Sequence, residues 1–415
     1  MDMKMKKIVT LAAFVALAIS LNAQSLDVSS AYQYMNKKPP LLKKAKECID
    51  RATLDEKARE DSRTWCYRAV IYTMIGAEST NSKSKYKDLD PNWADKAYEA
   101  AMECKRLDTK HEWDVQLKDA FGNIGAEYFN RSGHLYNEKK YDEAMQFAVK
   151  AIDMFNNGGP ENAKNANLAT YRAGIIAMAT RDTASIKKYF NSLMRKKSDN
   201  EQVYTVLFNV YKAEKNDKQA MNVATTFQKN CPNDYHAYLI LAEGYLMNNN
   251  VELGKEQINK ALELTKDSAN IYPVLLAQSA ALLEITGDFA GAEAKYMESL
   301  TLNPVQFEAN FNMGKMFYNR AVDKVNNAPE PDPFDENSLA LYDKLVEESK
   351  DLFRQSITYL VKAVEYLDAL PEAEKPYHRG NLGSALDALS TAYARVEMYQ
   401  ESTAAKNRVK ELQAE

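Results

Sequence analysis

The chain has 415 residues, of which 45% are apolar and 27% are charged, and its formal net charge at pH 7 is −4. This composition is typical of a folded protein with a large apolar core, and it excludes a disordered or low-complexity chain. The mild negative charge argues against nucleic acid or an anionic membrane as the main partner.

The N-terminus has the pattern of a secretory signal peptide. Residues 1–7 carry three lysines, an apolar run of 14 residues follows over 8–21, and Ala23 precedes the polar Gln24. That run is shorter than the roughly 20 residues that a membrane span needs, which favours a cleaved leader over a membrane anchor. We predict a signal peptide over residues 1–23. The mature chain would then hold 51 basic and 57 acidic residues, a net charge of −6.

A lead-in segment over residues 24–40 is predicted to hold one helix that ends before Pro39. Residues 41–200 are predicted to form an N-terminal series of degenerate helical pairs. Trp65, Ala69 and Tyr72 have spacings of four and three, which place them on one face of a helix.

Residues 201–305 carry the clearest pattern. Tyr204, Phe208 and Tyr211 follow one another at spacings of four and three. A second apolar set with similar spacing begins at Ala220, and related sets return about 34 residues later, from Tyr238 and from Gly254. Two apolar helical faces in each 34 residues predict stacked helical hairpins that share one core.

This pattern resembles the tetratricopeptide repeat, with an aromatic, a small residue and a Tyr on the first helix, and small and aromatic residues on the second. The resemblance implies an all-α fold, a right-handed α-solenoid of about nine stacked helix-turn-helix hairpins. It also implies a protein-binding scaffold without catalysis of its own. The Ala-Gln ending of the leader resembles that of exported proteins from Bacteroidetes-type bacteria, which predicts a periplasmic location, with outer-membrane association or secretion as alternatives.

Residues 306–415 are predicted to form C-terminal repeats that are interrupted by an acidic, proline-rich insertion at 324–338. The insertion surrounds Phe334 with acidic residues. We favour a passive loop, and a docking segment is the alternative.

The resemblance implies that the first helices of the hairpins line a concave, partner-binding face. Its register places there a set of mixed polar and apolar residues, with no strong net charge. They are Gln202, Thr205, Asn209, Lys212, His236, Leu239, Glu243, Glu308, Phe311, Lys315 and Tyr318. Phe311 and Tyr318 are predicted to be the strongest contacts, because they are aromatic and are expected outside the core. The alternative is that these side chains are merely solvated.

No catalytic or cofactor motif is present in the sequence, and the four histidines are widely separated. We therefore predict no enzyme activity, no cofactor and no metal. Asp88, Asp90, Asn92 and Glu99 have part of the spacing of a calcium loop, but Trp93 stands where that loop needs Gly. A helix start capped near Asp90 is the preferred interpretation.

Four cysteines, Cys48, Cys66, Cys104 and Cys231, leave the disulfide question open. An exported protein favours pairing, and Cys66 could approach either Cys48 or Cys104. Cysteine is equally suited to a small core position, and Cys231 is expected to be unpaired.

The function predicted from these observations is a non-catalytic protein-interaction scaffold exported to the bacterial envelope, which binds a peptide or protein segment. The alternative is an accessory protein that captures glycans or peptides in an outer-membrane uptake or secretion complex.

Overall fold

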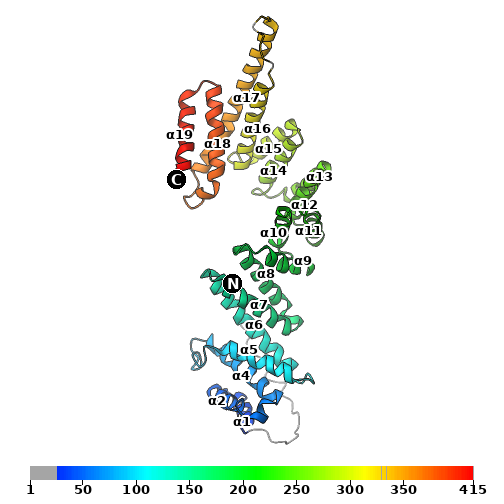
Figure 1. Ribbon diagram of the computed structural model, residues 1–415, viewed down its shortest axis with the longest axis vertical. Helices are drawn as coiled ribbons and strands as arrows, with labels where there is room; N and C mark the ends of the chain where they lie inside the picture. Colours follow the sequence, from blue (N-terminus) through cyan, green and yellow to red (C-terminus); the bar gives the residue numbers. More distant parts are fainter. Residues whose placement is uncertain (1–25, 329, 333, 415) are drawn as a thin grey trace. The chain divides into compact units, whose positions relative to one another are not determined.

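The computed structural model describes residues 26–328, 330–332 and 334–414, and within these residues it contains 19 α-helices and no strand (Figure 1). The predicted signal peptide lies outside the described residues. The chain forms two compact units that divide between Val210 and Tyr211, inside one helix. This architecture confirms the predicted all-α helical repeat fold.

The first unit holds nine helices and the start of a tenth. They are α1 (Leu26–Met35), α2 (Leu42–Ala52), α3 (Glu56–Arg59), α4 (Ser62–Ser79), α5 (Trp93–Leu107), α6 (Asp114–Asn137), α7 (Tyr141–Asn157), α8 (Ala163–Ala179), α9 (Thr183–Arg195) and the first residues of α10 (Glu201–Ala213).

The second unit continues from the end of α10. Its helices are α11 (Asp217–Asn230), α12 (Tyr235–Met247), α13 (Val251–Thr265), α14 (Tyr272–Ile285), α15 (Phe289–Leu302), α16 (Phe307–Asn326), α17 (Glu336–Asp368), α18 (Lys375–Arg395) and α19 (Tyr399–Ala414).

Consecutive helices pack as antiparallel hairpins in both units. The first unit contains the pairs α1–α2, α4–α5, α6–α7 and α8–α9, and the second contains α12–α13, α14–α15, α16–α17 and α18–α19. The helices α10 and α11 follow one another in the chain between these two series, and the eight packed pairs of the described residues are close to the predicted number of about nine. Because a single hairpin cannot bury its apolar face alone, each pair depends on its neighbours for a core.

Glycines on one helix of a hairpin pack directly against large aromatic rings of the other helix. A Cβ atom added to Gly76 in α4 would overlap the buried ring of Trp93 in α5, and one added to Gly174 in α8 would overlap the ring of Phe190 in α9. The backbones of these pairs therefore approach closely where the glycines stand. This is the physical basis of the alternation of small and aromatic residues in the sequence.

A disulfide joins the two helices of the second hairpin. Cys66 in α4 and Cys104 in α5 are both buried, and their Cα atoms lie 5.1 Å apart. Cys48 in α2 is also buried, but it stays outside the disulfide, and its sulfur accepts a hydrogen bond from Arg51 Nη2 at 3.4 Å. The structure thus selects one of the pairings that the sequence left open.

Two helices differ in extent from the sequence-based expectation. The sequence pattern predicts that the third helical pair starts near Gly125, but the helix α6 begins at Asp114. The predicted insertion at 324–338 is partly helical, since α16 extends to Asn326 and α17 begins at Glu336. The Asp335 carboxylate accepts a hydrogen bond from the Asn337 backbone N–H at 2.9 Å, and this cap starts α17 before the first apolar residue of its pattern.

A half-buried carboxyl group in the α14–α15 hairpin, that of Glu284, predicts a pH effect on stability. The Tyr296 hydroxyl donates a hydrogen bond to Glu284, and burial raises the pKa of Glu284 above its ordinary 4.5, against the opposing effects of that bond and of Lys315. A raised carboxyl pKa means that the folded state binds its proton more tightly than the unfolded chain does. The stability contribution of Glu284 is therefore fully present below pH ~4.3 and is lost as the pH rises through the folded-state pKa.

We expect Glu284→Gln to remove this pH dependence. The variant should gain stability relative to the natural chain as the pH rises from about 4.3 toward neutrality, because an amide carries no charge to desolvate. Calorimetric unfolding of the second unit at several pH values measures the difference. Glu298→Gln is the matched control, since Glu298 accepts an exposed hydrogen bond from Tyr272 in the same hairpin at 3.3 Å. An identical pH response of the two variants would contradict the prediction.

Candidate binding surface

Within each unit, the first helices of successive hairpins lie directly against one another. In the first unit α4 contacts α6 and α6 contacts α8, and in the second unit α14 contacts α16 and α16 contacts α18. We call the surface formed by these helices in each unit its first-helix face. Side chains from several hairpins can therefore act together on one ligand.

An aromatic row crosses the start of the first-helix face in the first unit. The rings of Tyr32 and Tyr67 have centroids 5.1 Å apart, and Tyr67 meets Trp113 edge-on at 5.4 Å. All three side chains are half-buried. Burial, followed by the neighbouring Tyr32, raises the pKa of Tyr67 to about 12, so its hydroxyl stays neutral at physiological pH. The row joins α1, α4 and the start of α6.

Arg172 in α8 is the most unusual cation of this face. Its guanidinium lies over the Phe129 ring of α6, 4.9 Å from the centroid, and an added Cβ on Gly133 would lie 3.0 Å from its Nη1 atom. The side chain is half-buried, and among the described residues it has neither a carboxylate partner nor a hydrogen-bond acceptor. The absence of a side chain at Gly133 leaves room for the guanidinium between the two helices.

The other arginines at comparable positions are paired. Arg131 in α6 contacts Asp95 at 3.0 Å and Glu127 at 2.8 Å. Arg68 in α4 contacts Asp50 at 3.2 Å. A guanidinium offers five N–H donors in a planar fork that matches a carboxylate. Arg172 is therefore the arginine of this group that is available to an external carboxylate.

The residues predicted from α10 have mixed environments. Gln202 accepts a hydrogen bond from the Tyr171 hydroxyl, and the Thr205 hydroxyl donates to the Glu201 carbonyl at 3.1 Å. Asn209 and Lys212 are exposed, and the Lys212 ammonium bonds the half-buried Glu243 of α12 at 2.6 Å. Some of the polar groups that were predicted to bind a partner are therefore already hydrogen-bonded within the chain.

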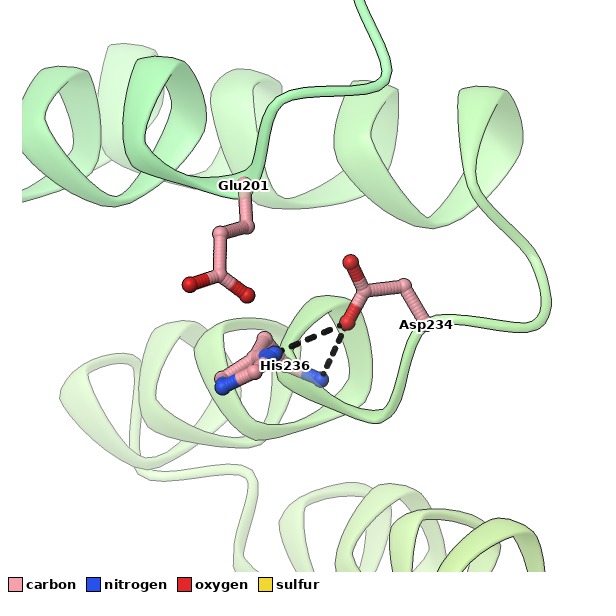
Figure 2. Close-up of side chains that lie close together, drawn as sticks. All are labelled: Glu201, Asp234 and His236. Carbon is pink, nitrogen blue, oxygen red and sulfur yellow. Dashed lines mark hydrogen bonds and ion pairs between the residues drawn. The ribbon is translucent and has the colours of Figure 1, made fainter.

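His236 is held at the start of α12 by its neighbour. Figure 2 shows Asp234 beside it, and the Asp234 Oδ1 atom accepts the His236 backbone N–H at 3.0 Å and lies 2.9 Å from its ring Nδ1. Glu201, the third residue labelled in Figure 2, belongs to the first unit. The third predicted residue of α12, Leu239, is half-buried against the apolar core that α12 shares with its neighbours.

The prediction that Phe311 lies outside the core is wrong. Phe311 is only 8% exposed and stacks on Phe307, with centroids 5.3 Å apart, inside the core between α16, α17 and α18. Tyr318 is half-buried and meets the Phe353 ring edge-on at 5.8 Å. The reason is that α18, the first helix of the next hairpin, lies over the side of α16 that carries Phe311.

The remaining predicted residues of α16 lie beside this covered side of the helix. Glu308 is exposed, and the Lys315 ammonium lies over the Phe311 ring, 5.1 Å from its centroid. Both could still contact a partner from the rim of the second unit's first-helix face, and the assignment of these two residues stays a prediction.

The surroundings of Asp90 favour the preferred interpretation, a capped helix start, over a calcium loop. Its carboxylate accepts hydrogen bonds from Lys96 Nζ at 2.7 Å and from the Asn92 backbone N–H at 3.1 Å, and Lys46 Nζ lies 3.5 Å away. Burial alone would raise the pKa of Asp90, but the bond and charge of Lys96 and the charge of Lys46 lower it. Two ammonium groups occupy the place of a cation, so Asp90 organises the turn before α5.

Sequence reasoning missed Tyr67, Trp113 and Arg172. Trp113 precedes the helix α6, whose first three turns lie before the predicted repeat start. Arg172 lies in a weakly patterned hairpin, and a sequence does not show whether an arginine has an acidic neighbour in space. The signal that could have found it is Gly133, a glycine inside a helix, where a close approach is a common reason for the residue.

The helices of the described segments 26–328, 330–332 and 334–414 include none that has both the length and the apolar character of a membrane span.

No protein-family model and no curated protein sequence matches the chain. Among solved structures, it is similar to the C-terminal part of a TPR repeat-containing protein from Cytophaga hutchinsonii, with 16% identity over 68% of this chain and 97% of that chain and a TM-score of 0.36. A TPR repeats protein from Bacteroides fragilis matches with 15% identity over 65% of this chain and 98% of that chain, and a TM-score of 0.25.

A third similar structure is YrrB, which is described as a TPR protein with an unusual peptide-binding site. It matches with 16% identity over 44% of this chain and 88% of that chain, and a TM-score of 0.34. Because these scores are low, the fold assignment rests on the packing of the hairpins described above. In its residue pattern and its helical hairpins, the chain is similar to tetratricopeptide repeat proteins.

Proposed function

We propose that the protein is a non-catalytic interaction scaffold that binds a peptide or protein segment on the first-helix face of its first unit. Arg172 is the observation that carries this proposal. A half-buried guanidinium without an acidic partner has lost part of its hydration, and a carboxylate that joins it forms charge-assisted hydrogen bonds. The matching feature of the partner is an acidic side chain or a terminal carboxylate.

The aromatic row supplies the second element of the proposed site. Tyr67 and Trp113 present rigid, half-buried rings, and such side chains contribute large contact areas at low cost in conformational entropy. Tyr67 lies on α4 and Arg172 on α8, and both of these helices contact α6 within the first unit. A bound segment that carries an acidic group and an apolar side chain would fit them.

We expect Arg172→Ala to weaken binding of the partner. Formaldehyde crosslinking of cells that make the tagged full chain, followed by mass spectrometry, should recover a small, reproducible set of envelope proteins, and the variant should recover them at least ~10-fold less, since loss of a buried charge pair costs about 2–5 kcal/mol. Arg195→Ala is the matched control, because Arg195 is an exposed arginine of α9, a second helix. Equal recovery by both variants would contradict the site.

Gly133→Ala tests the same site without touching a charge. The new methyl group would meet the end of the Arg172 side chain, which can move away, so the fold should be retained while the guanidinium is displaced. We expect a loss of partner recovery with unchanged or slightly raised stability, because alanine favours a helix over glycine by about 1 kcal/mol. Loss of recovery together with unfolding would instead indicate a structural role.

We further propose that the protein is exported to the bacterial periplasm. The predicted signal peptide supports this proposal, and so does the Cys66–Cys104 disulfide, because disulfides persist in oxidising compartments. Cell fractionation with the tagged chain tests it. Recovery of an uncleaved chain in the cytoplasm, with both thiols reduced, would contradict it.

The capture of glycans or peptides in an uptake or secretion complex is a second candidate function. It is favoured by a stack of rings in the second unit, where Phe307 lies 5.7 Å from the exposed Tyr366 in a nearly parallel orientation. Sugar rings pack on such exposed aromatic faces. If the crosslinking experiment recovers glycans and no protein, and Tyr366→Ala abolishes that recovery, this function replaces the scaffold.

A further inference from the structure

The α16–α17 hairpin continues beyond its own core. The last buried residue of α16 is Ala321 and the first buried residue of α17 is Ser349, so the described residues between these two contain none that is buried. In Figure 1 this distal part of the hairpin projects beyond α15 and α18, which belong to the same unit. A projection that buries so little contributes little to the stability of the fold.

The tip of this projection presents a phenylalanine to solvent. Phe334 is 95% exposed, and Leu341 and Leu339 on the first turns of α17 are also exposed. The turn that carries Phe334 is held by hydrogen bonds. Its backbone N–H donates to Asp332 Oδ1 at 2.9 Å, and the Asp332 N–H donates to Ser338 Oγ at 3.0 Å. The turn therefore fixes the residues beside the ring and leaves the ring itself without apolar contacts.

The charge of the tip is entirely negative. Between Lys324 and Lys344 the sequence contains no lysine or arginine, and the acidic residues there are Glu330, Asp332, Asp335, Glu336 and Asp343. The two flanking lysines do not neutralise these charges, since the Lys324 ammonium bonds Glu348 and the Lys344 ammonium lies 3.9 Å from the same residue. No ion pair involves the acids of the tip within the described residues.

We propose that this tip, residues 330–341 without residue 333, is a second docking element, which inserts Phe334 into an apolar pocket rimmed by lysine and arginine on a partner protein. Burial of an exposed phenylalanine side chain in an apolar pocket favours binding, and such an aromatic is the kind of residue that dominates a small interface. The surrounding carboxylates select a basic rim and exclude an acidic one. The site is independent of Arg172, which lies in the other unit.

The test places a photoreactive p-benzoylphenylalanine in place of Phe334 in the full chain and irradiates intact cells. The same analogue at Tyr399, a 65% exposed residue of α19, is the control position. We expect an adduct from position 334 whose partner peptide combines apolar residues with lysine or arginine. Its yield should fall at least ~10-fold when Glu330→Lys and Glu336→Lys are added, because reversal of two rim charges creates repulsion. Neither of these side chains holds the turn.

Each other result would overturn the proposal. One such result is an adduct with a second copy of the chain, with lipid, or with a peptide that lacks basic residues. Another is an adduct yield that is no higher than at position 399, or that does not change with the charge reversals. Phe334→Ala should leave the melting temperature unchanged, since the ring has no core contact, so a folding defect cannot imitate the loss of the adduct. Arg172→Ala should leave the 334 adduct unaffected, which separates failure of this proposal from failure of the scaffold site.

Discussion

Loss of the Cys66–Cys104 disulfide is expected to lower the free energy of unfolding of the first unit by about 3–4 kcal/mol. The two cysteines are 38 residues apart in sequence, and a crosslink of that span restricts the unfolded chain by an amount that the chain-entropy model places in this range. Both cysteines are buried between α4 and α5, so replacement by serine would add the cost of burying a hydroxyl without a partner.

The three tryptophans make this measurement specific to one unit. Trp65, Trp93 and Trp113 all belong to the first unit, so urea unfolding followed by tryptophan fluorescence reports that unit alone. The natural chain should lose stability when reductant is added, and the double variant Cys66→Ser, Cys104→Ser should be insensitive to it. Cys48→Ser retains the disulfide and should still respond to reductant. A natural chain whose transition does not move with reductant would exclude a stabilising crosslink.

Gly76→Ala is expected to destabilise the first unit by up to about 2 kcal/mol, although alanine is the better helix former. The added Cβ would overlap the Trp93 ring, a rigid group that is itself buried and cannot swing away. Overpacking of this kind costs roughly 1–3 kcal/mol, and it exceeds the gain of about 1 kcal/mol in helix propensity. The same fluorescence transition measures the effect.

Gly133→Ala is the matched control for this prediction. It is the same substitution in a helix of the same unit, but its Cβ would meet the flexible end of Arg172. The two variants should therefore change stability in opposite directions or by clearly different amounts. If both raised stability equally, the close approach of Trp93 to α4 would not constrain the hairpin.

The positions of the hairpins follow from residues that are close in sequence. Ala144, Ala148 and Ala151 define the buried side of α7, and Tyr204 and Phe208 define that of α10, as their spacing predicts. Such spacings report the period of a helix, and the period is a local property of the chain. The existence of the helices and their pairing are therefore predictable from the amino-acid sequence.

The candidate site is much less predictable, because it depends on which helix covers which side chain. Phe311 has the spacing of a surface stripe but is buried, since α18 lies over that side of α16. Arg172 resembles any other arginine in sequence. Only the packing of α8 on α6 reveals that its guanidinium lies over the Phe129 ring and beside Gly133, with no carboxylate partner among the described residues.

The sequence by itself thus determined the helical repeat, its approximate number of hairpins and the exposed, acidic character of the Phe334 segment, because these depend on periodicity and composition. Only the tertiary structure decided that Cys66 pairs with Cys104, that the α16 stripe is covered and that Arg172 lacks a partner among the described residues. These facts concern residues from different helices, and their separation in space depends on how close the small residues allow neighbouring backbones to come.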